Sequence, residues 1–268
     1  MMMGTTKAET GSGGVRLIDV DAESFDKLPC CGIKSPKHTG RQEKCRWLRE
    51  NAEFGLRAKA ILAANGQPSG YIEYVPGGFA WRGVKAAGYM LIHCIWIYSK
   101  HHQRKGWGSI LVRACLDDAR KAGMSGVAVI VREGPWMADR RLFLANGFEA
   151  VDTAPPDYEL LAIKFDSHAA APAFEKDWRR KLGQYQQGLT VIRSCQCPHI
   201  AKFASDIVET AQNEYHIKPI VIDLKSWSDA QQAPTPYAVF ALIHNGRLLA
   251  DHQISRTRFR NIMNSLVM

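Results

Sequence analysis

The stretch QRKGWG, Gln103 to Gly108, decides the fold, because it stands between a long apolar run and an amphipathic segment. The run before it, GYMLIHCIWIY (88–98), is rich in β-branched and aromatic residues, which predicts a central strand covered on both faces. After it, apolar residues recur at helical spacing from 108 to 122, and Gly123 is a suitable end for the helix. A strand, a glycine-containing loop and a helix start in this order predict an anion site, because unpaired amide groups and the helix dipole meet there.

The residue types of the loop suit a phosphate. Gly106 and Gly108 allow close backbone approach, and Arg104 and Lys105 add positive charge at the rim. The pattern matches neither GxGxxG of dinucleotide-binding folds nor GxxxxGK[ST] of phosphate-loop nucleotidases. A plain tight turn from strand to helix is the competing interpretation.

The spacing Gln103-x-x-Gly106-x-Gly108 resembles the coenzyme A loop of the GNAT acetyltransferases. Downstream, RRLFLANGFEAV (140–151) resembles the family's second signature, in which a helix ends in a Gly-Phe pair before a strand. The resemblance implies an α/β (α+β) fold over 15–167, a GNAT mixed sheet flanked by helices. It also implies acetyl-CoA as co-substrate and N-acetyltransferase activity on a small amine-bearing acceptor, by direct attack on the thioester.

The resemblance carries residue roles with it. The backbone from Gln103 to Ser109 would bind the pyrophosphate, and the WIY end of the strand would lie along the pantetheine. The implied cofactor-binding residues are Trp96, Ile97, Tyr98, Gln103, Arg104, Lys105, Gly106, Trp107, Gly108, Ser109 and Asn146. Many relatives place a tyrosine acid four residues before the glycine of the Gly-Phe pair. Here that position is Phe143, so the usual acid is absent.

Two residues are candidates for the general base that deprotonates an acceptor amine. His93 comes first, because it lies on the predicted central strand and an imidazole has a suitable pKa. Glu73 lies on the preceding strand, in GYIEYVPG. The competing interpretations are a core histidine held by hydrogen bonds and a solvent-facing glutamate. Cys94 should point to the opposite face of a regular strand and pack in the core.

A second, smaller α/β unit is predicted for 188–268, after a linker and bridging helix at 168–187. Its pattern is strand, helix, strand, two further strands and a terminal helix. Cys195 and Cys197 stand where the first strand gives way to the helix, which favours a lowered thiol pKa. With Pro236 before a later strand, the unit resembles the thioredoxin-like domain of YoaP-like acetyltransferases. A redox enzyme would need Cys-x-x-Cys, which this turn lacks.

The remaining cysteines leave an alternative function open. Cys30 and Cys31 precede His38 and Cys45, but this spacing fits no standard zinc motif, and no metal is predicted. Cys30 and Cys31 could instead help to recognise the acceptor above the acyl site. The alternative to acetyl transfer is a thiol- or metal-handling binding protein that uses these cysteines and the second unit.

Charge and hydropathy bear on the partners and the location of the protein. The net charge of +9 is shared by both halves of the 268 residues, and no basic-aromatic stacking pattern appears, so no nucleic-acid partner is expected. No apolar run is long enough for a membrane span, and 1–14 reads as a disordered leader without a signal-peptide core. These features predict a cytoplasmic enzyme. A homodimer stays open beside a monomer.

Overall fold

The computed structural model describes residues 10–11, 15–28, 30–33, 35–98 and 100–267. The expected leader lies mostly outside this part, but Thr10–Gly11 form the short strand β1 against β2. Among the described residues, no helix is both long and apolar enough to cross a lipid bilayer.

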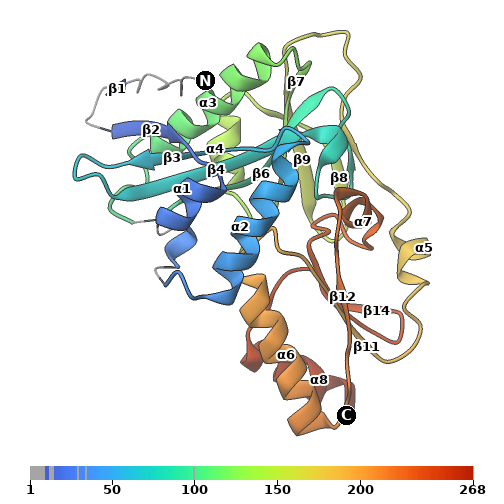
Figure 1. Ribbon diagram of the computed structural model, residues 1–268. Coiled ribbons are helices and arrows are strands. Elements are labelled where there is room, and N and C mark those ends of the chain that lie inside the picture. Colours follow the sequence, from blue (N-terminus) through green and yellow to red (C-terminus); the bar gives the residue numbers. More distant parts are fainter. Residues whose placement is uncertain (1–9, 12–14, 29, 34, 99, 268) are drawn as a thin grey trace.

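The first unit is built on an eight-stranded mixed sheet, ordered β1-β2-β3-β4-β6-β7-β9-β8 (Figure 1). All neighbouring pairs are antiparallel except β6 and β7, which run parallel and are joined through a helix. The strands after β1 are β2 (Val15–Asp19), β3 (Arg57–Leu62), β4 (Pro68–Pro76), β6 (Tyr89–Ile97), β7 (Gly126–Val131), β8 (Glu149–Ala154) and β9 (Tyr158–Lys164).

Helices cover both faces of this sheet. One face carries α1 (Ala22–Lys27) and α2 (Thr39–Ala52), and the other carries α3 (Trp107–Lys121) and α4 (Arg140–Leu144) (Figure 1). Alternate side chains of β7 enter two different apolar clusters, which confirms that the central strands are buried on both sides. Short 3₁₀ turns occur at Cys30–Gly32 and Gly77–Phe79.

The second unit has a four-stranded sheet of order β12-β11-β13-β14. β11 (Leu189–Arg193) is parallel to β12 (Ile220–Asp223) and antiparallel to β13 (Phe240–His244), which pairs with β14 (Arg247–Ala250). The helices are α6 (Ile200–Tyr215), α7 (Trp227–Gln232) and α8 (Arg256–Val267). The predicted order of elements is therefore present, although α7 was not foreseen.

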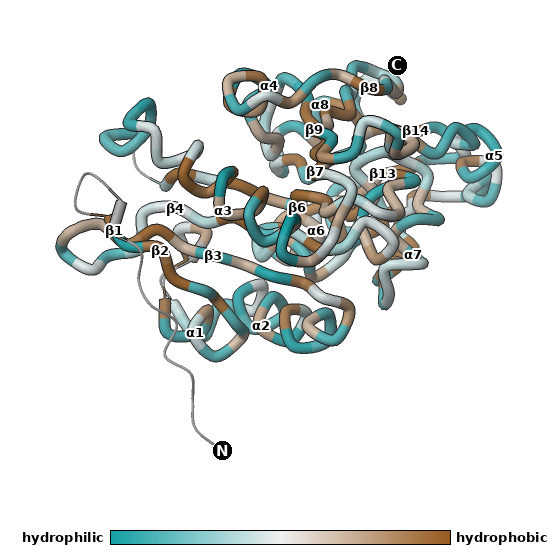
Figure 2. Tube along the Cα trace, turned by 90° about the horizontal axis from the view of Figure 1, so that it is seen from above, coloured by the Kyte–Doolittle hydropathy of each residue, from teal (hydrophilic) through white to brown (hydrophobic). Residues whose placement is uncertain are grey.

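The two units are joined by more than a linker. In the expected linker, β10 (Ala173–Phe174) pairs with β5 (Val84–Lys85) of the first unit, and α5 (Trp178–Leu182) follows. A single cluster of buried apolar side chains runs through both units. Figure 2 shows hydrophobic segments along the strands and hydrophilic stretches on the outer helices. The second unit is thus packed firmly against the first.

The helix before the Gly-Phe pair begins at Arg140, because Asp139 caps it and Trp136 has a left-handed φ of 72° that no helix accommodates. Among the described residues, the peptide bond that is cis is Pro155–Pro156.

Candidate active site

A β-bulge at His93 shapes the centre of the candidate site. Glu73 of β4 faces Cys94 of β6, whereas the next residue, Tyr74, faces Ile92, so His93 is the extra residue. Directly opposed residues share a face of the sheet, and Cys94 therefore lies on the same side as Glu73. The prediction that Cys94 packs in the core on the opposite face is wrong, because the bulge breaks the alternation. Cys94 lines a cavity together with His93 and Glu73.

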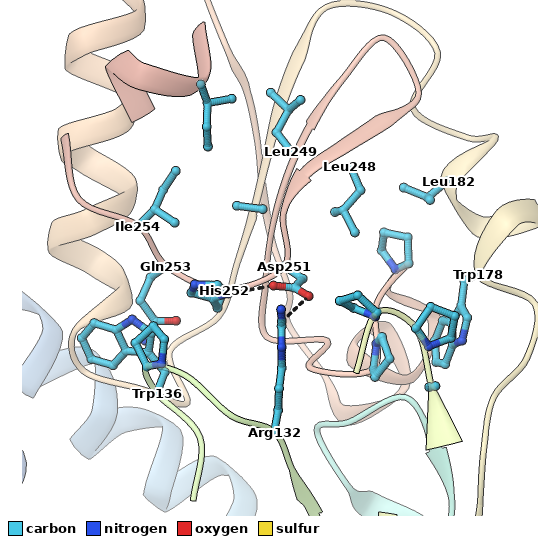
Figure 3. A pocket seen from close by; sticks show the side chains of 18 of the residues that line it. Arg132, Trp136, Trp178, Leu182, Leu248, Leu249, Asp251, His252, Gln253 and Ile254 are labelled. Carbon is cyan, nitrogen blue, oxygen red and sulfur yellow. Dashed lines mark hydrogen bonds and ion pairs between the residues drawn. The ribbon is translucent and has the colours of Figure 1, made fainter. Parts of the chain in front are cut away.

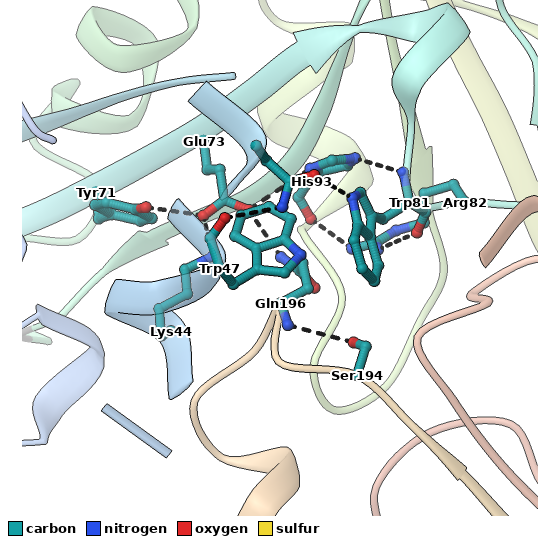
Figure 4. Close-up of polar contacts among 10 residues, drawn as sticks. Lys44, Trp47, Tyr71, Glu73, Trp81, Arg82, His93, Ser194 and Gln196 are labelled. Atoms are coloured by element: carbon teal, nitrogen blue, oxygen red, sulfur yellow. Dashed lines mark hydrogen bonds and ion pairs between the residues drawn. The ribbon is translucent and has the colours of Figure 1, made fainter. Parts of the chain in front are cut away.

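Four side chains surround the Glu73 carboxylate, which is fully buried (Figure 4). Lys44 of α2 forms an ion pair with it, and the Tyr71 hydroxyl donates a hydrogen bond of 2.8 Å. The side-chain amide of Gln196, from the second unit, donates another of 2.9 Å. His93 Nδ1 lies 3.6 Å from the carboxylate. The interpretation of Glu73 as a solvent-facing residue is therefore wrong.

This network fixes the protonation of its members. Burial opposes ionisation of Glu73, but the charge of Lys44 and the hydrogen bonds outweigh it and lower the pKa of the carboxyl. Burial lowers the pKa of His93 to about 4, against the opposing effect of Glu73. His93 Nε2 accepts a hydrogen bond of 3.0 Å from the Trp81 amide, so its proton belongs on Nδ1, toward Glu73. Neither nitrogen of His93 then has a free lone pair with which to deprotonate an acceptor amine.

The turn Cys195–His199 of the second unit forms one wall of the same cavity, of about 380 Å³. The turn approaches the first unit through backbone contact: a Cβ built on Gly40 of α2 would lie 1.8 Å from the Pro198 carbonyl oxygen. Tyr237, which follows Pro236 and precedes β13, also lines the cavity. The predicted residues His93, Glu73, Cys31 and Cys197 are thus brought together, although they come from distant parts of the chain.

The thiol pKa values of Cys195 and Cys197 are not lowered, although both residues precede the start of a helix. Burial raises the pKa of both Cys195 and Cys197 above the ordinary value, so the prediction of activated thiolates is wrong. The Cys94 thiol has its pKa raised by burial to about 12. All three are free thiols. Of these, Cys94 and Cys197 line the cavity, which therefore presents neutral sulfhydryl groups at pH 7.

The predicted phosphate loop lies at the start of α3. Gly106 is the N-cap residue, with a left-handed φ of 79°, and no side chain caps the helix. Gln103 to Gly106 are exposed, and the Gln103 side chain donates a hydrogen bond of 3.4 Å to the Ile97 carbonyl. The rings of His102 and Trp107 stack at 4.2 Å. The first amide groups of a 15-residue helix are thus open to an anion.

The strand end and the second signature lie on the two sides of this loop. Trp96 is 41% exposed and lines the cavity, whereas Ile97 packs against the apolar cluster below α3. Asn146 donates a hydrogen bond of 2.9 Å to the Ser109 hydroxyl, which ties the second signature to α3. Phe143 is fully buried and packs against Phe148, so no polar group stands at the position of the usual acid.

Cys31 and Cys45 lie in different surroundings. Cys31 is buried and lines the cavity, as the acceptor-recognition prediction requires, whereas the Cys30 side chain lies outside the described residues. Cys45 contacts Asp26 instead, with its Sγ 3.8 Å from a carboxylate oxygen. Within the described part of the chain, no three His, Cys, Asp or Glu side chains are placed to hold a metal ion.

Comparison with known proteins assigns both units. The acetyltransferase (GNAT) family model matches residues 23–148. The first unit is a GNAT acetyltransferase domain. The YoaP-like family model matches residues 220–261, so the second unit carries a YoaP-like domain. The predicted pairing of the two is confirmed, whereas the thioredoxin-like description stays a prediction.

Individual relatives show the same combination or the first domain alone. The chain is 27% identical over 244 residues to the uncharacterized N-acetyltransferase YoaP of Bacillus subtilis, covering 90% of this chain and 95% of the relative. It is similar to the structure of yncA from Salmonella typhimurium with its cofactor acetyl-CoA (18% identity, TM-score 0.45, 59% of this chain and 98% of that one). It is also similar to PaiA N-acetyltransferase from Thermoplasma acidophilum in complex with coenzyme A (15%, 0.41, 56% and 99%).

Several residues that line the cavity between the two domains were not identified as site residues from the sequence. They are Lys44, Arg82, Trp136, Gln196, His199 and Tyr237. Lys44 looks like an ordinary polar residue of an amphipathic helix, and Gln196 stands between two more conspicuous cysteines. Only His199 carried a usable signal, because a histidine directly after Cys-Pro begins the helix of the YoaP-like domain.

Proposed function

We propose that this acetyltransferase moves the acetyl group of acetyl-CoA directly to a small primary amine held between the GNAT and YoaP-like domains. The observation that carries the proposal is the position of the uncapped start of α3 next to the β6 strand end, with a cavity on the bulged side of β6. A thioester laid along Trp96–Tyr98 would reach that cavity. The cavity is lined by both domains, which would shield the reaction from water.

The proposed cofactor contacts are those of the loop and the strand end. Amides of Gln103–Ser109 would hold the pyrophosphate, Arg104 and Lys105 would add charge, and Asn146 would keep Ser109 in place. The alternative of thiol or metal handling receives no support, because the thiols are protonated and buried or half-buried. A cytoplasmic location and the homodimer alternative stay predictions from the sequence.

Introducing a negative charge at the loop should weaken acetyl-CoA binding strongly. Gly106→Asp places a carboxylate at the proposed pyrophosphate site, at a left-handed φ of 79° where a side chain adds some backbone strain. Repulsion at about 5 Å is worth about 3 kcal/mol, so we expect the Kd for acetyl-CoA to rise roughly 100-fold. Isothermal titration calorimetry with acetyl-CoA measures it.

Gly123→Asp is the matched control. Gly123 follows the other end of α3, also has a left-handed φ (67°, against 79° at Gly106), and also has open space around a built Cβ. It should bind acetyl-CoA as the unaltered protein does. Equal affinity of both variants would refute the loop as the cofactor site, and absence of any binding by the unaltered protein would refute the proposed function.

A further inference from the structure

The cavity contains a histidine, His199, to which the proposed function gives no role so far. His199 is the last residue of the Cys195–His199 turn and the N-cap residue of α6, so the YoaP-like domain supplies it. Its ring lines the cavity between the two domains. It is half-buried, with Trp136 of the GNAT domain 5.4 Å away between ring centres.

The hydrogen bonding of His199 fixes its tautomer. Nε2 lies 3.0 Å from the backbone carbonyl oxygen of Cys31. A carbonyl oxygen can only accept, so Nε2 must carry the hydrogen, and in the neutral ring the lone pair is on Nδ1. Among the described residues, no donor lies within hydrogen-bond distance of Nδ1. His199 is therefore a base with one nitrogen anchored and the other available.

The surroundings keep the ring neutral. Burial is the largest influence and lowers the pKa of His199, while the Cys31 carbonyl raises it and the nearby His38 lowers it further. The thiols of Cys31 and Cys197 line the same cavity, and burial raises the pKa of the Cys197 thiol, which keeps it uncharged at pH 7. An uncharged imidazole keeps its lone pair through the physiological range, which is what a general base requires.

His199 also stands where an acceptor would arrive. Trp136, 39% exposed, lines both the inner cavity and a larger cleft of about 1430 Å³ between the domains. Figure 3 shows Trp136 beside Gln253, with the Arg132 to Asp251 ion pair in the same cleft. Phe203, one turn after His199 on α6, packs edge-on against Trp136 at 5.3 Å. An amine that enters the inner cavity beside Trp136 therefore lies next to His199.

We propose that His199 of the YoaP-like domain is the general base for the GNAT domain, a role that rests on the proposed acetyl transfer. Nδ1 takes one proton from the acceptor ammonium, which leaves a neutral amine. The amine nitrogen then forms a bond to the thioester carbonyl carbon, and the carbon–sulfur bond breaks. The second nitrogen proton passes to the departing coenzyme A thiolate. The products are the acetamide, coenzyme A thiol and one proton released from His199 to solvent.

His199→Gln tests the role with little change of shape, because the glutamine amide can still donate to the Cys31 carbonyl but offers no basic lone pair. The probe reaction is the release of coenzyme A thiol from acetyl-CoA in the presence of phenethylamine. This primary alkylamine carries a phenyl ring that can pack against Trp136 in the cavity. We expect kcat to fall 10²- to 10⁴-fold with unchanged acetyl-CoA affinity. In the unaltered protein, kcat/KM should rise with pH through a pKa below 6.5, and the variant should lose this limb. Added imidazole should restore part of the rate.

His216→Gln, an exposed histidine just after the other end of α6, is the control and should keep full activity. Independently of any acceptor, ¹⁵N NMR of the ring should show Nδ1 without a hydrogen and Nε2 with one. A His199→Gln variant that retains the rate and the pH profile, or an Nδ1-protonated ring, would overturn the proposal. Acetyl-CoA binding by the unaltered protein separates these outcomes from a failure of the proposed function.

Discussion

Gly40→Ala is expected to lower acetyl transfer about 100-fold while acetyl-CoA affinity stays within twofold. The added Cβ would lie 1.8 Å from the Pro198 carbonyl oxygen, so the Cys195–His199 turn must move by at least about 1 Å. A displacement of that size at a reacting centre costs on the order of 10²-fold in rate. Alanine by itself favours a helix over glycine by about 1 kcal/mol, so any loss reflects the contact between domains.

The measurement is steady-state thiol release with acetyl-CoA and phenethylamine, alongside calorimetric titration of acetyl-CoA. Gly78→Ala serves as the control, because Gly78 is exposed and a built Cβ meets no atom within 4 Å. It should match the unaltered protein. If Gly40→Ala retains full turnover, the position of the turn is unimportant for acetyl transfer, and the YoaP-like domain is a passive neighbour of the cavity.

The second large effect is expected at Glu73. Glu73→Gln leaves the Lys44 ammonium, only 1% exposed, without its counter-charge in the protein interior. Breaking one side of a buried ion pair costs about 3–5 kcal/mol, which corresponds to a Tm lowered on the order of 10 °C. Thermal unfolding followed by circular dichroism at pH 7 measures it. The double variant Lys44→Met/Glu73→Gln should recover much of the loss, since no buried charge remains.

The exposed pair of Lys27 and Glu23 provides the comparison. Its side chains are 71% and 78% exposed, so Glu23→Gln should leave the Tm almost unchanged. A similar Tm for Glu73→Gln and Glu23→Gln would show that the buried network adds no stability.

The pH dependence of stability has a definite sign at Glu73. Its pKa in the folded state lies below the ordinary 4.5, so its contribution is fully present above that value and is lost as the pH falls through the folded-state pKa. Glu73→Gln should therefore differ most from the unaltered protein above pH 4.5, and the gap should narrow in acid. A gap that widens in acid would contradict an ionised, paired carboxylate.

The features that depend on short stretches of chain were predictable from the sequence. The loop Gln103–Gly108, the buried strand before it and the helix after it were all predicted close to their observed bounds, because apolar periodicity and glycine act locally. The order of elements in the second unit followed for the same reason. The second signature also identifies Phe143 at the position of the usual acid, and the structure buries this side chain.

The acceptor side of the site could not be predicted from the sequence, because it depends on contacts between distant parts of the chain. The bulge that turns Cys94 toward Glu73 depends on the register between β4 and β6, which a regular alternation of residues does not reveal. Gln196 reaches Glu73 across 123 residues, and His199 meets Cys31 across 168. Contacts of that separation arise from packing the second domain on α2, where Gly40 permits the approach. The burial that comes with this packing also raises the thiol pKa values of Cys195 and Cys197, against the local expectation from a helix start.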